Sequence, residues 1–138
     1  MTKVYLDIDG VLLTKSNTHA VDGAEEFLDF VLSKYDCYWL TTHCRNGQTD
    51  HLLKMLANYF SDKVMNSLEK VKPTVWNTLK TEAIDFNADF YWLDDYVFEA
   101  EKDVLKRHGC LNKLILVNLD NKGELLNVML KLKLCSHR

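Results

Sequence analysis

Near its N-terminus the chain carries an apolar run, Val4 to Leu12, that contains two carboxylates one residue apart followed by a glycine. A run of β-forming residues that meets glycine is typical of a short buried strand entering a turn. Because side chains alternate along a strand, Asp7 and Asp9 are expected on the same side. Two ionised carboxylates there repel each other, and a cation would stabilise them. The run therefore predicts a metal site at the end of a strand; a capping aspartate followed by a turn aspartate is the alternative.

Apolar strand-like stretches and amphipathic helical stretches alternate along the rest of the chain. After the first strand, further strands are expected at 37–40, 62–65, 89–93 and 114–117. Helices are expected at 22–35, 49–60, from Pro73 to about 84, 97–108 and 123–134. Strands that alternate with helices predict a parallel sheet covered on both faces. The expected fold class is therefore α/β, a three-layer α/β/α sandwich of the Rossmann-like type with about five strands.

Length and composition narrow the class of protein. The 138 residues suit one domain with a hydrophobic core, and we expect residues 1–138 to form a single domain. A net charge of −3 carries no electrostatic footprint for non-specific nucleic-acid binding, so no nucleic-acid partner is expected. No apolar run approaches the ~20 residues that span a bilayer, and we expect neither a signal peptide nor a membrane partner. The four cysteines lack metal-ligand spacing, which favours free thiols in a reducing, cytoplasmic compartment.

Three of the predicted strands end in polar side chains. These are Asp7 and Asp9, Thr41 and Thr42, and Asp94 and Asp95. The carboxyl ends of parallel strands lie along one edge of the sheet, where ligand sites form near the topological switch point. Capping residues without a shared function would instead be scattered between the two edges. The pattern therefore predicts one functional site at this edge, beside a polar stretch at 14–20 that could form a flap.

The residue types at this edge suit phosphoryl transfer. Oxygen ligands without a cysteine and histidine cluster favour Mg²⁺ over Zn²⁺. Magnesium held by carboxylates usually keeps open positions for a substrate phosphate. An aspartate can attack phosphorus, and a second carboxyl group can protonate the leaving group and then activate water. A hydroxyl and a lysine can hold the phosphoryl oxygens in the transition state.

These motifs resemble those of a known superfamily. The sequence DIDGV at 7–11 resembles the DxDx(T/V) motif of the haloacid dehalogenase superfamily, a large group rich in Mg²⁺-dependent phosphatases. Leu-Thr at 40–41 is similar to its second motif, and Trp-Leu-Asp-Asp at 92–95 to its fourth. The short segments between the motifs resemble those of small members that lack a large cap domain. The resemblance implies a Rossmann-like catalytic domain with an open site.

The resemblance also implies a role for each matched residue. Asp7 would be the nucleophile and a Mg²⁺ ligand, and Asp9 would be the general acid and base and would bind Mg²⁺ through its main-chain carbonyl. Thr41 would bind the phosphoryl group. Asp94 and Asp95 would complete the metal site, with Asp95 aligned with the ligating acid of the family's GDxxxD variant.

The third motif of the family is a lysine at the start of a helix, and two lysines are candidates. Lys80 looks like the helix-start lysine of small members that have a tryptophan just upstream, and it is preferred. Lys72, directly before Pro73, is the alternative. Glu99 falls at the last acid of the GDxxxD variant, or is an acid in the first turn of a helix.

The loop after the second motif contains further polar residues. His43 and Arg45 either contact substrate or belong to an ordinary polar loop. Cys44 resembles a phosphatase thiol nucleophile only superficially, because no arginine follows at the spacing of a cysteine-phosphatase loop.

The function implied is that of a Mg²⁺-dependent phosphohydrolase that acts through an aspartyl-phosphate on a phosphorylated small molecule or macromolecule. A phosphotransferase of the same fold is an alternative, since only the acceptor differs. A receiver-like signalling domain is a second alternative, but its acids, threonine and lysine come in another order along the chain. A non-catalytic binding module that kept the fold is the third.

Overall fold

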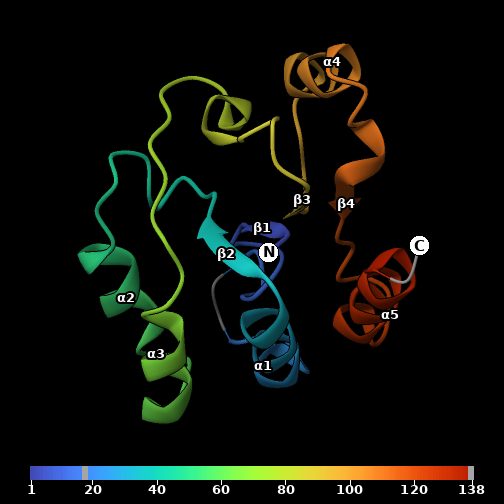
Figure 1. The fold of residues 1–138 in the computed structure, drawn as a ribbon. Helices are drawn as coiled ribbons and strands as arrows, with labels where there is room; N and C mark the ends of the chain where they lie inside the picture. Colours follow the sequence, from blue (N-terminus) through green and yellow to red (C-terminus); the bar gives the residue numbers. More distant parts are fainter. Residues whose placement is uncertain (17–18, 137–138) are drawn as a thin grey trace.

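The computed structural model describes residues 1–16 and 19–136 (Figure 1). The strands are β1 (Lys3–Leu6), β2 (Asp36–Trp39), β3 (Phe90–Asp94) and β4 (Leu114–Leu116). The α-helices are α1 (Ala24–Lys34), α2 (Asp50–Leu56), α3 (Asp62–Leu68), α4 (Glu99–Arg107) and α5 (Glu124–Ser136). Two short 3₁₀-helices, η1 (Lys80–Ala83) and η2 (Leu111–Lys113), precede β3 and β4.

The four strands form one parallel sheet in the order β2-β1-β3-β4. From β1 the chain passes through α1 to β2 on one side. It then returns through α2, α3 and η1 to β3 on the other side of β1. The strand order thus reverses between β1 and β3, the place where α/β sheets bind ligands. The predicted α/β class with a parallel sheet is confirmed.

Side chains alternate between the two faces of the sheet, and helices cover both (Figure 1). Val4 and Leu6 of β1 belong to the core cluster beneath α1, α3 and α5, whereas Tyr5 belongs to the opposite cluster beneath η1 and α4. The same alternation places Leu93 on the first face and Trp92 on the second. The central strands β1 and β3 are apolar in sequence because side chains on both of their faces are buried.

The prediction of about five strands is wrong, because the described residues contain four. Residues 62–65 lie in α3, whose first turn is capped by the Ser61 hydroxyl as it accepts the N–H of Val64 at 3.4 Å. The place of the fifth strand, beside β2, is held by a single parallel bridge between Tyr38 and Lys72. Two residues on, the Thr74 hydroxyl takes the position of a backbone N–H and donates to the Trp39 carbonyl at 2.6 Å. The ladder therefore ends after one bridge.

The helix predicted to start at Pro73 is also absent, since the segment before η1 is irregular. Its backbone pairs with the loop after β2: the N–H of Trp76 donates to the Arg45 carbonyl at 2.9 Å, and the N–H of Gly47 donates to the Thr74 carbonyl at 3.1 Å. The apolar stripe that suggested a helix instead contributes Trp76 and Ile84 to the core beneath η1. Long-range pairing replaces helical hydrogen bonds here.

Part of the predicted flap at 14–20 lies outside the described residues, at positions 17 and 18. The ends of this stretch pair with each other, through an antiparallel bridge between Leu13 and Ala20 and a hydrogen bond from Thr14 N–H to the His19 carbonyl. This connection leads from the first strand's turn into α1.

Two expectations drawn from composition can be compared with the structure. All four cysteines are free. Among the residues that the structure describes, no helix has the length and apolar character needed to cross a membrane.

Candidate functional site

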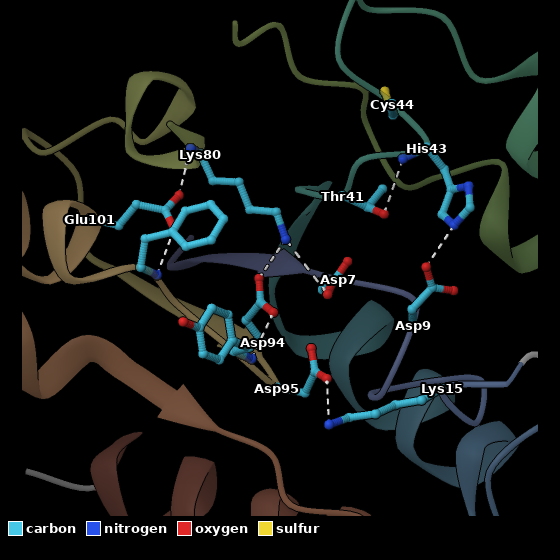
Figure 2. A network of polar contacts seen from close by, with 12 residues as sticks. Asp7, Asp9, Lys15, Thr41, His43, Cys44, Lys80, Asp94, Asp95 and Glu101 are labelled. Carbon is cyan, nitrogen blue, oxygen red and sulfur yellow. Dashed lines mark hydrogen bonds and ion pairs between the residues drawn. The ribbon is translucent and has the colours of Figure 1, made fainter. Parts of the chain in front are cut away.

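The sheet register brings the acids of two strands together. Leu6 of β1 lies opposite Leu93 of β3, so the next residues, Asp7 and Asp94, are level with each other. The N–H of Asp7 donates to the Leu93 carbonyl at 3.1 Å. Carboxylate oxygens of Asp7, Asp94 and Asp95 lie within 4.8 Å of one another (Figure 2). We call these three residues the acidic triplet.

A lysine reaches the acidic triplet from η1. Lys80 Nζ lies 2.7 Å from Asp94 Oδ2 and 3.6 Å from Asp7 Oδ2 (Figure 2). The alternative lysine, Lys72, pairs instead with Asp36, the first residue of β2, at 2.9 Å. It therefore lies toward the opposite end of the sheet. Of the two candidates, only Lys80 contacts the acids.

A buried glutamate that the sequence motifs did not predict anchors this lysine. Glu101 is only 2% exposed, and its carboxylate accepts the N–H of Lys80 at 2.7 Å and the N–H of Phe98 at 3.0 Å. It links the start of η1 to the start of α4. The third position of a helix is where a capping-box acid stands, but phenylalanine at the N-cap hides that signal.

Asp9 is separated from the triplet and faces the loop after β2. Its Oδ2 lies 2.9 Å from His43 Nε2 (Figure 2). The main-chain N–H of His43 donates to the fully buried hydroxyl of Thr41 at 3.3 Å. The single carboxylate pair predicted at Asp7 and Asp9 is thus divided: Asp7 faces Lys80, and Asp9 faces His43.

The remaining polar candidates take other positions. Lys15, from the turn after β1, lies 3.6 Å from Asp95, a contact that the sequence did not predict. Arg45 stacks over the Trp76 ring, 4.5 Å from its centroid, and donates a hydrogen bond to the Asn77 carbonyl. Glu99 is exposed, pairs with Lys102 at 3.5 Å and does not join the triplet.

Burial and mutual repulsion shape the electrostatics of the acids. Burial and the charge of Asp7 raise the pKa of Asp94 to about 7, although Lys80 opposes the shift. Burial also raises the pKa of Asp7. The charge of Lys80 and the hydrogen bond between Asp7 and Thr41 oppose this shift. Burial lowers the pKa of Lys80, but the charges of Asp7 and Asp94 outweigh it, and the net shift is upward. The acids therefore hold protons more strongly than exposed carboxylates do.

The triplet has the donor set of a hard-cation site. When all groups are ionised, the three carboxylates and the ammonium groups of Lys80 and Lys15 that contact them leave a net charge of −1, which favours binding of a cation. All three donors are oxygens, the ligand type of Mg²⁺ and Ca²⁺. The residues present therefore fit a divalent metal ion.

Comparison of the chain with models of known families, with curated proteins and with solved structures finds no match. The resemblance to the haloacid dehalogenase superfamily therefore rests on the sequence motifs alone.

Proposed function

We propose that this protein is a Mg²⁺-dependent phosphohydrolase of the haloacid dehalogenase type that acts through an aspartyl-phosphate. One observation carries the proposal: the acidic triplet, Lys80 and Thr41 meet at the carboxyl edge of the sheet, although they are far apart in sequence. A set of acids that served only as helix or turn caps would not require a half-buried lysine among them.

In the proposed reaction Asp7 is the nucleophile. A carboxylate oxygen of Asp7 attacks phosphorus, and the bond from phosphorus to the leaving-group oxygen breaks. Lys80 Nζ and the Thr41 hydroxyl hold the phosphoryl oxygens as charge redistributes among them. Bound at the triplet, Mg²⁺ would supply positive charge that offsets the repulsion between the substrate phosphate and the carboxylates.

Asp9 is the proposed general acid and base. It donates a proton to the oxygen of the departing alcohol, and it is left as a carboxylate. It then takes a proton from a water molecule that attacks the aspartyl-phosphate, which releases phosphate and restores Asp7. The 2.9 Å contact with His43 orients the Asp9 carboxyl group away from the triplet and toward the loop after β2.

The test is hydrolysis of 4-nitrophenyl phosphate with and without Mg²⁺, in the wild type and in Asp7→Asn. We expect Mg²⁺-dependent turnover in the wild type and a loss of at least about 10³-fold in the variant. Asp36→Asn is the control, because Asp36 is a carboxylate paired with a lysine away from the triplet. Turnover that persists in Asp7→Asn would refute the role of Asp7 as the nucleophile. Turnover that is independent of Mg²⁺ would refute the metal dependence.

A further inference from the structure

A polar pocket adjoins the site on the side of Asp9. It has a volume of about 480 Å³ and lies between the loop after β2 and the first turns of α2. All of its lining residues are polar or charged, among them His43, Arg45, Asn46, Gln48, His51 and Lys54. We call it the β2–α2 pocket.

The position of Asp9 connects this pocket to the chemistry. His43 both lines the pocket and contacts the Asp9 carboxylate at 2.9 Å. In the proposed function, Asp9 protonates the leaving-group oxygen, so that oxygen lies within hydrogen-bond reach of Asp9. The β2–α2 pocket is therefore the space that adjoins this leaving-group oxygen on the His43 side of Asp9.

The charges of the lining residues indicate that the β2–α2 pocket favours a negatively charged group. Among the lining residues, Arg45 and Lys54 contribute two positive charges, against one negative charge from Asp50; the charge of Arg45 also interacts with Glu82, which does not line the pocket. The guanidinium of Arg45 is held in place by the Trp76 ring and the Asn77 carbonyl, so little side-chain entropy is lost when it binds an anion. Lys54, on the exposed side of α2, supplies the second positive charge.

The cavity on the other side of the acids has a different charge balance. It measures about 610 Å³ and is lined by Lys15, Asp95 and Asp120, among other residues. The Lys15 ammonium is already paired with Asp95, and Asp120 adds a second negative charge. An anionic group would therefore be repelled from this side and attracted to the β2–α2 pocket.

We infer that the β2–α2 pocket binds the leaving-group part of the substrate and that this part carries a second anionic group, a phosphate or a carboxylate. The inference rests on the proposed function, because it is the role of Asp9 that directs the leaving group into the pocket. The substrate class is then a phosphate monoester with an additional anion on its alcohol portion.

The test compares three esters of the same chain length: 3-hydroxypropyl phosphate, propane-1,3-diyl bisphosphate and 3-(phosphonooxy)propanoate. We expect the second anion to raise kcat/KM at least about tenfold over the hydroxyl compound, an advantage typical of a charge-assisted contact. The bisphosphate and the carboxylate arms show which anion the pocket prefers. In Lys54→Gln this preference should fall about tenfold, mainly through KM, while Lys131→Gln on α5 serves as the charge-matched control.

A binding measurement separates this inference from the proposed function. Calorimetry with Asp7→Asn measures the affinity for the same three compounds without turnover, with and without Lys54→Gln in the same chain. Hydrolysis of 4-nitrophenyl phosphate with no preference for a second anion would overturn the inference alone. Binding of the bisphosphate that depends on Lys54, in a protein that hydrolyses nothing, would overturn the proposed reaction and leave the anion site standing. If the protein neither hydrolyses nor binds any of these compounds, both the proposed function and this inference are overturned.

Discussion

The side chain of Asp95 occupies the space in which a side chain at position 10 would lie. Gly10 has a φ of +78°, and a Cβ added there would be 2.8 Å from the Cβ of Asp95 and still closer to its carboxylate. The absence of a side chain at Gly10 therefore permits Asp95, the third acid of the triplet, to reach its position. This packing brings the turn after β1 against the end of β3.

Gly10→Ala should displace Asp95 and weaken divalent-cation binding by at least about tenfold, because one ligand of three is moved. Isothermal titration with Mg²⁺ measures this effect. Gly109→Ala is the matched control: Gly109 also has a positive φ, of 68°, but an added Cβ meets nothing within 4 Å. Both variants should lose about 1 kcal/mol of stability from backbone strain. Equal Mg²⁺ affinities in the two variants would refute a role for the Gly10–Asp95 packing.

Lys80→Met should lower kcat by about 10²- to 10³-fold, the usual cost of removing one transition-state charge donor. It should also lower the free energy of unfolding at neutral pH, because Asp7 and Asp94 lose the cation that lies between them. Lys72→Met is the control and should retain activity, since Lys72 pairs with Asp36 elsewhere. The opposite result, with activity lost only in Lys72→Met, would transfer the phosphate-binding role to Lys72.

The raised pKa of Asp94 predicts how stability depends on pH in the metal-free protein. The pKa of Asp94 rises from an ordinary value of 3.8 to about 7 in the folded state, so between these values the native state binds more protons than the unfolded state. The free energy of unfolding should therefore fall as pH rises from 4 to 7, by up to about 1.4 kcal/mol per pH unit for one proton.

Urea unfolding at several pH values in EDTA measures this slope. Asp94→Asn should flatten it, although the raised pKa of Asp7 will leave a smaller slope of the same sign. Excess Mg²⁺ should restore stability at the higher pH, because the cation binds the ionised carboxylates of the native state. An unchanged slope in Asp94→Asn would show that other groups bind the protons.

Glu101→Ala should reduce both stability and turnover. It leaves the N–H groups of Lys80 and Phe98 without their acceptor in a part-buried position, which costs on the order of 1 to 2 kcal/mol for the pair. Glu82→Ala is the comparison, because Glu82 accepts three backbone N–H groups at an exposed site where water can replace it.

Urea unfolding measures the loss of stability in Glu101→Ala, and kcat for 4-nitrophenyl phosphate measures the loss of turnover. Glu101→Gln keeps one acceptor oxygen and should recover part of the stability. A loss of stability no larger than that of Glu82→Ala would contradict the anchoring role of Glu101.

Local sequence patterns correctly predicted those strands and helices whose structure depends mainly on their own residues. The run ending at Leu6 and the stretch before Asp94 are short, apolar and rich in β-forming residues, which favours buried strands, and α1 shows a clear helical period. Sequence patterns gave wrong predictions where contacts with residues distant in the sequence determine the local structure. At Thr74, a side-chain hydroxyl bonds the β2 carbonyl and ends the ladder, and around Trp76 the backbone pairs with the loop after β2.

The sequence by itself determined which chemical groups stand at strand ends, because strand period and turn residues are local properties. Asp7, Thr41 and Asp94 could be placed at one sheet edge from that information alone. Only the tertiary structure decided how these groups are shared: Lys80 lies among the acids, Asp9 turns to His43, and Glu101 anchors η1. These contacts join residues 14 to 73 positions apart, and their geometry follows from sheet register and packing, which no local pattern encodes.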